Sequence, residues 1–157
     1  MVGTDEQAVP EEHRRYWKYQ RDLAAVDDKA EPELVATVLR DPDKVMAEAA
    51  ISGHFDQRAP QLMQLGSTRF DQWATTMSPL IAERKFLTRR LREWTLLKSI
   101  ILGHNWTPED VVAATDWLQR KAANTVTAPD ALTLLTEHGR TRRVRNAANN
   151  RLHRPTP

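Results

Sequence analysis

The chain has 157 residues, 40% of them hydrophobic and 28% charged, a composition typical of a globular protein with its own core rather than of a disordered chain. It has no cysteine, which excludes disulfides, thiolate metal sites, iron–sulfur clusters and cysteine nucleophiles. The net charge of +2 conceals an asymmetry, because residues 1–56 carry 13 Asp/Glu and 7 Lys/Arg whereas the remainder carries 8 and 16.

The first predicted element is a helix from about Pro10 to Val26. Proline followed by Glu11 and Glu12 suits a helix N-terminus, where an N–H is not needed and negative charge is stabilised. Five side chains at helical spacing predict a broad apolar stripe on it: Tyr16, Trp17, Tyr19, Leu23 and Val26. We expect this helix to form an N-terminal extension over residues 1–30.

From residue 31 onward the sequence contains a repeated pattern that begins with proline. Each proline is followed by a short apolar segment, usually a polar turn, and then a second segment of small or aliphatic residues. Apolar residues recur at three- and four-residue spacing without the alternation of strands, so the predicted fold is all-α. The sequence predicts about five helix–turn–helix units whose first helices begin at the prolines: Pro32, Pro60, Pro79, Pro108 and Pro129.

The second segments of three units contain alanine pairs: Ala49/Ala50, Ala122/Ala123 and Ala147/Ala148. Two short helices cannot bury an apolar face alone and must stack on neighbouring units, and small residues allow close approach. We therefore expect these alanines to be buried between units. Gly53 and Gly103 are predicted to end helices in the left-handed conformation, and Asp43 of the "DPD" turn is a candidate N-cap.

The segment from Leu80 to Leu102 departs from the repeat because no proline or glycine interrupts it. It predicts one or two long helices, with a charged stretch on one side. The other side carries an apolar stripe that we interpret as core rather than as a ligand pocket: Phe86, Leu87, Leu91, Trp94, Leu97 and Ile101.

The segments "EPELVATVLRDPDKVMAEAA" (31–50) and "NTVTAPDALTLLTEHGRTRRVRNAANN" (124–150) resemble the leucine-rich repeat variant family, a relative of the HEAT and armadillo repeats. "GHNWTPEDVVAATDWLQRKAAN" (103–124) is similar, and residues 60–105 are only loosely so. The resemblance implies a right-handed α-solenoid of paired short helices over residues 31–150, with a tail over 151–157. A founding member of that family carries a cysteine-bound iron–sulfur centre, and nothing of that cofactor carries over to a chain without cysteine.

Catalytic and metal-binding patterns are sparse. None of the five histidines has a partner at the i, i+4 spacing of a helical metal pair, and no phosphate loop or nucleophile elbow is present. His54 and His104 follow glycines at matching places and are better explained as helix-end residues than as metal ligands. No apolar run is long enough for a bilayer and the N-terminus lacks a secretory signal, so we expect a cytoplasmic protein with no membrane segment and no cofactor.

Three classes of function remain open. The preferred one is a non-catalytic helical-repeat module that binds a protein or peptide partner. The second is nucleic-acid binding through the basic C-terminal repeats, since guanidinium groups suit phosphates. The third is an enzyme resembling HEAT-like DNA glycosylases, for which Trp73, Trp94, Trp106 and Trp117 are candidate aromatic residues. For either kind of binding the predicted contact residues are Arg89, Arg90, Arg92, Arg140, Arg142, Arg143, Arg145, Asn146, Asn149 and Arg151.

Overall fold

The structure, a computed structural model, describes residues 10–154, so the ends of the predicted extension and tail lie outside the described residues. Over this range the prediction of an all-α fold is confirmed, because nine helices and no strand are present. The chain divides into two compact units, Met1–Thr88 and Arg89–Pro157, whose boundary falls within α5. The helices are α1 (Glu11–Ala25), α2 (Glu31–Leu39), α3 (Lys44–Gln64), α4 (Ser67–Leu80), α5 (Lys85–Ile101), α6 (Pro108–Ala113), α7 (Asp116–Thr125), α8 (Pro129–His138) and α9 (Arg142–Leu152).

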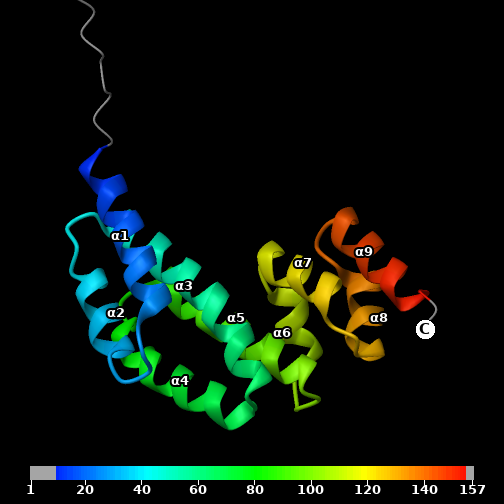
Figure 1. The fold of residues 1–157 in the computed structure, drawn as a ribbon. Helices are drawn as coiled ribbons and strands as arrows, with labels where there is room; N and C mark the ends of the chain where they lie inside the picture. The colour runs from blue at the N-terminus through cyan, green and yellow to red at the C-terminus, as the bar shows by residue number, and fades with distance from the viewer. Residues whose placement is uncertain (1–9, 155–157) are drawn as a thin grey trace, which may run out of the picture. The chain divides into compact units, whose positions relative to one another are not determined.

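The first unit is organised around α3, which packs against α1, α2 and α4 (Figure 1). Aromatic rings join α3 to α4: Trp73 meets Phe55 edge-on with ring centroids 5.2 Å apart and Phe70 at 5.6 Å. All three rings are at least 94% buried, so they form the centre of this unit's core. Trp73, a candidate for an aromatic cleft, is therefore a core residue.

The N-terminal helix begins and ends within one residue of its predicted bounds, with Pro10 as N-cap and Val26 as C-cap. Its predicted apolar stripe is wrong in extent, because only Leu23 is buried and Trp17 is 51% exposed. Polar contacts contribute to holding the helix: Arg15 Nε and Tyr19 Oη donate hydrogen bonds to Asp41 at 2.9 and 2.8 Å. The same carboxylate accepts from the Asp43 backbone N–H, so the "DPD" turn anchors α1.

The proline rule holds for three of the five helices it predicted. Pro32, Pro108 and Pro129 lie at the first or second position of α2, α6 and α8. The prediction is wrong for Pro60 and Pro79, which lie inside α3 and α4. Around Pro60, buried side chains on both sides of the proline pack as one continuous helix face: Phe55, Ala59, Leu62 and Met63.

The two glycines predicted as helix stops differ. Gly53 lies in the middle of α3, so that prediction is wrong. Gly103 follows α5 with φ of 73°, the left-handed conformation that glycine adopts without steric cost, which confirms the second. Asp43 is confirmed as the N-cap of α3, since its carboxylate accepts a 3.1 Å hydrogen bond from the Met46 N–H.

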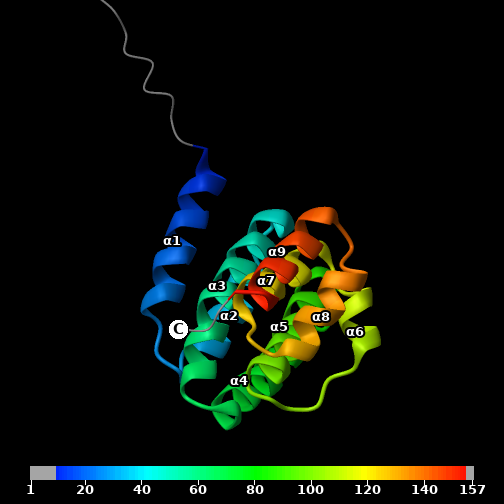
Figure 2. The ribbon, with the colours of Figure 1, turned by 90° about the vertical axis from the view of Figure 1, so that its right-hand side faces the viewer.

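In the second unit, α6 packs against α8, and α7 packs against α9 (Figure 2). The predicted burial is confirmed here for Ala122, Ala123 and Ala148, whereas Ala147 is only partly buried. In the first unit Ala50 is buried and its neighbour Ala49 is exposed. At least one residue of each predicted pair is therefore buried.

The stripe predicted along α5 is largely core. Leu91, Trp94 and Leu97 are at least 95% buried, as is Leu87 in the first turn. The two ends of the stripe are not core, because Phe86 and Ile101 are 46% and 43% exposed. Ile100 is buried in place of Ile101, one residue earlier on the helix.

Candidate functional site

Three of the predicted contact arginines bind backbone carbonyls at helix ends. Arg140 Nη2 donates to the Ala114 carbonyl at 3.0 Å, and Arg145 Nη1 donates to the Gly139 carbonyl at 2.8 Å. Arg151 Nη1 donates to the Val126 carbonyl. The accepting residues are the C-caps of α6, α8 and α7, where carbonyls lack an intrahelical partner. Part of the basic character of this region therefore stabilises helix ends.

Arg90 is also held by the fold. Its guanidinium carbon lies 3.8 Å from the centroid of the Trp117 ring, a cation–π geometry. Trp117 in turn meets Trp94 edge-on at 5.3 Å. Trp94 and Trp117, which were candidates for an aromatic cleft, therefore pack edge-to-face against each other, and Trp117 also contacts a cation.

The remaining predicted residues divide between two helices. Arg142, Arg143, Asn146 and Asn149 are exposed on α9. Arg89 and Arg92 are exposed on α5, one helical turn apart. The structure therefore does not gather the ten predicted residues at one site, but it does bring Arg89, Arg92 and Arg140 to the same cavity.

This cavity, which we call the arginine groove, has a volume of about 710 Å³ and lies within the second unit. Its α5 wall is one helix face, with Arg89, Arg92, Leu96 and Ser99 at spacings of three and four residues. Small side chains from the end of α6 and the connection to α7 also line it, namely Ala113, Ala114 and Thr115. The full lining is Arg89, Arg92, Glu93, Thr95, Leu96, Ser99, Asn105, Trp106, Asp110, Ala113, Ala114, Thr115, Asp116 and Arg140.

Two of the three acidic residues in the lining already have partners. Glu93 is 7% exposed, and its carboxylate accepts from the Thr115 N–H at 2.8 Å and the Thr115 hydroxyl at 2.5 Å. Asp116 forms an ion pair with Arg120 at 2.9 Å. The exposed charges facing the groove are therefore mainly cationic, with Asp110 as the remaining carboxylate.

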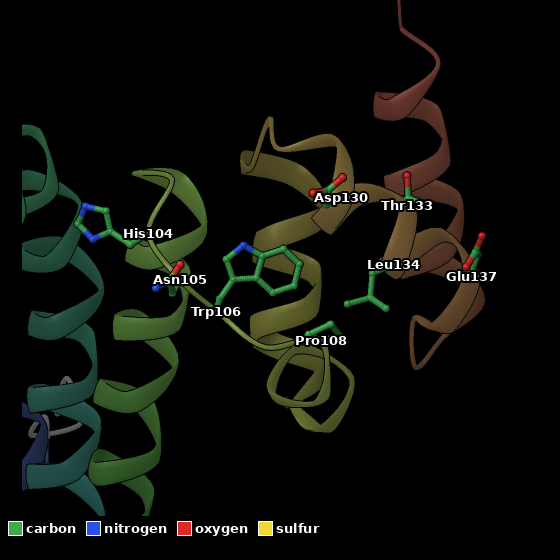
Figure 3. Close-up of a pocket in the computed structure, with 8 residues that line it drawn as sticks. All are labelled: His104, Asn105, Trp106, Pro108, Asp130, Thr133, Leu134 and Glu137. Atoms are coloured by element: carbon green, nitrogen blue, oxygen red, sulfur yellow. The ribbon is translucent and has the colours of Figure 1, made fainter.

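A second cavity of about 520 Å³, the tryptophan hollow, shares Asn105 and Trp106 with the arginine groove. Its far wall is one face of α8, which carries Asp130, Leu134 and Glu137 (Figure 3). Trp106 had been considered only as part of an enzyme cleft, and the α8 residues were missed. The signal was available, because Asp130, Thr133, Leu134 and Glu137 recur at helical spacing in "PDALTLLTEH" and so share one face of the helix.

A buried carboxylate in the first unit is a second feature that sequence reasoning missed. Glu31 is 2% exposed and accepts from His54 Nε2 at 2.6 Å, Trp73 Nε1 at 3.0 Å and Arg58 Nε at 3.4 Å. Burial raises the pKa of Glu31, but hydrogen bonds from His54 and Trp73 and the nearby charges outweigh it, so the pKa lies below its ordinary value. The carboxylate therefore joins α2 to α3 and α4 as an ionised group.

Other candidate chemistry is limited. His54 contacts Glu31, whereas His104 lines the tryptophan hollow, so these two histidines belong to different units. Within residues 10–154 no three His, Asp or Glu side chains are placed to hold a metal ion. None of the helices described combines the length and apolar character needed to cross a membrane.

No protein-family model, no curated protein and no solved structure matches this chain. The resemblance to the leucine-rich repeat variant therefore stays a prediction, and the two cavities of the second unit are the features that bear on function.

Proposed function

We propose that this protein is a non-catalytic binding module of the helical-repeat kind, and that its arginine groove binds an acidic segment of a partner protein. The observation that carries the proposal is the groove itself, in which Arg89, Arg92 and Arg140 line one cavity of about 710 Å³. A volume of this size is typical of pockets that enclose a ligand. Guanidinium groups bind carboxylates through two parallel hydrogen bonds, so a peptide with Asp or Glu fits this wall.

Helix pairing supports the repeat part of the proposal. The N-cap residues Thr115 and Thr141 hold equivalent positions before α7 and α9, and each hydroxyl accepts from the N–H three residues later. Seven residues after each cap, Ala122 and Ala148 are fully buried where α7 packs on α9. This repetition supports the proposal, because an α-solenoid is built from helix pairs that repeat the same contacts.

A second repeated device joins successive elements. The Glu93 carboxylate accepts from the Thr115 N–H, and the Gln119 side-chain oxygen accepts from the Arg140 N–H at 2.8 Å. Both accepting side chains are buried. The first donor, Thr115, lies in the connection before α7, and the second donor, Arg140, lies in the connection before α9. This repeated contact supports the proposal that the fold is built from repeats similar to those of the leucine-rich variant and HEAT-like families.

Selection from a displayed library of random peptides tests the proposed function. We expect the wild-type protein to enrich peptides with clustered Asp and Glu. The double variant Arg89→Glu/Arg92→Glu should lose that preference and enrich Lys and Arg instead, because the sign of the groove wall is reversed. The matched control is Arg142→Glu/Arg143→Glu, the same charge change on exposed residues of α9 outside the groove.

The control variant must keep the acidic preference. Equal selection by the wild type and the groove variant, with both folded by circular dichroism, would refute the proposal. Loss of the preference in the α9 variant alone would place the contact surface on α9 instead.

Nucleic-acid binding is the second candidate, and one observation favours it. The first turn of α9 contains no acidic residue and carries Arg142 and Arg143, both exposed. Positive charge at a helix N-terminus is unfavourable for the helix, so a phosphate backbone would relieve it. Fluorescence anisotropy with a labelled duplex and a labelled single strand across a salt series tests this. Salt-dependent binding that Arg142→Glu/Arg143→Glu abolishes is expected, and no binding at low salt would exclude it.

A further inference from the structure

We propose that the tryptophan hollow binds a lysine or arginine side chain of the same partner, beside the arginine groove; this rests on the proposed function. The two cavities share Asn105 and Trp106 as a common wall. A ligand that fills both would place an anionic group on one side of Trp106 and a cationic group on the other. The partner class is then a segment with a basic residue close to acidic ones.

The walls of the hollow combine apolar surface with carboxylates. In Figure 3 the Trp106 ring points toward Leu134, with Pro108 below and Asp130 above them. Trp106 is partly exposed, so its ring is accessible from the hollow. A long aliphatic stem can lie along Leu134 and Pro108, and a cation beside the indole face gains cation–π attraction.

The spacing of the carboxylates decides between a metal ion and an organic cation. Asp130 and Glu137 are seven residues apart on α8, which corresponds to about 10 Å along the helix axis. A calcium ion binds its oxygen ligands at about 2.3–2.6 Å, so these two carboxylates are too far apart to share one ion. They instead give the hollow an extended negative wall, which excludes anions and suits the positively charged end of a flexible side chain.

Titration with a small probe, followed by NMR, tests the hollow without any peptide. The probe is Nα-acetyl-lysine N-methylamide, and its neutral counterpart is Nα-acetyl-norleucine N-methylamide. The signal is the ¹⁵N–¹H resonance of the Trp106 indole, assigned by its loss in Trp106→Phe. We expect the lysine probe to shift this resonance and the norleucine probe to shift it much less.

Removal of the two carboxylates should weaken the lysine probe. In Asp130→Asn/Glu137→Gln we expect binding about two- to fivefold weaker, as for exposed cation–π and ion-pair contacts. The matched control is Glu33→Gln/Glu109→Gln, which removes two exposed carboxylates that line neither cavity and should leave the probe's affinity unchanged. Equal shifts with both probes, no shift, or unchanged affinity in Asp130→Asn/Glu137→Gln would overturn the assignment.

The link to the partner has its own readout in the peptide selection. Wild-type peptides should carry a basic residue near their acidic cluster, and Asp130→Asn/Glu137→Gln should lose the basic residue while keeping the acidic ones. If the acidic preference itself is absent, the proposed function fails. If the acidic preference is present but no basic residue accompanies it, the inference about the shared partner fails alone.

Discussion

Replacing Glu31 by glutamine removes the charge from a buried carboxylate of the first unit while keeping its size. The carboxylate is 2% exposed and takes hydrogen bonds from His54 and Trp73 at 2.6 and 3.0 Å. The glutamine amide offers one oxygen and presents two N–H donors to groups that are themselves donors. Breaking a buried ion pair by removing one partner costs about 3–5 kcal/mol, and we expect a loss of this size.

The same residue predicts how stability depends on pH. The pKa of Glu31 is lower in the folded protein than its ordinary value, because the hydrogen bonds and charges of His54, Trp73 and Arg58 outweigh the effect of burial. The ionised group therefore stabilises the fold above the unfolded pKa of about 4.3. The unfolded state has the higher pKa and takes up its proton at a higher pH. The contribution is therefore lost as the pH falls through the folded pKa. Glu31→Gln should lack this part of the acid sensitivity.

Urea unfolding from neutral to acidic pH, followed by far-ultraviolet circular dichroism and tryptophan fluorescence, measures both effects. The control is Glu33→Gln, the same change on an exposed residue of the same helix. It should leave the free energy of unfolding and its pH dependence nearly unchanged. If the two variants were equally stable at neutral pH, the hydrogen bonds of Glu31 would not be a significant source of stability.

Three further substitutions test other contacts. Gln119→Leu removes the hydrogen bonds of a buried amide, which donates to the Val111 carbonyl at 2.9 Å and accepts from the Arg140 N–H at 2.8 Å, and should cost about 2–4 kcal/mol in urea unfolding. Asp41→Asn removes the carboxylate that holds α1, so hydrogen exchange should quicken in α1 and stay unchanged in α8. Ala148→Arg should lower the melting temperature far more than Asn149→Arg, because the first side chain is fully buried and the second is exposed; similar melting would contradict close packing of α7 on α9.

The prolines show where local sequence signals are sufficient and where they are not. Pro108 follows Thr107, whose hydroxyl accepts from the Asp110 N–H. The N-cap residue and the proline therefore both predict that the helix begins at Pro108. Pro60 follows Ala59, a buried residue in a helical turn that offers no side-chain cap. A proline fixes φ at a helical value in both places, and only long-range packing decides whether the helix started earlier.

The arginines show a different limitation. The sequence predicted a positively charged region correctly, but it did not indicate which group each guanidinium binds. A run such as "GRTRRVR" predicts positive charge, but a guanidinium can bind a phosphate, a carboxylate or a carbonyl equally well in chemical terms. In the folded chain Arg140 and Arg145 reach carbonyls at helix ends, whereas Arg142 and Arg143 are exposed. Arginines near helix C-termini were one available signal, because the last carbonyls of a helix lack intrahelical partners.

The candidate site depends on contacts between residues far apart in sequence, which local sequence patterns do not predict. Arg89 and Arg140 line one groove because Glu93 holds Thr115 near α5 and Arg140 donates to Ala114, the residue before that threonine. The first step consists of two hydrogen bonds and the second of one, and both join residues far apart in sequence. Arg140 therefore has two roles, since its N–H and guanidinium fix the connection while its charge faces the groove. A ligand that binds this charge would also stabilise the junction between α6 and α9, so ligand binding and the stability of the second unit should be coupled.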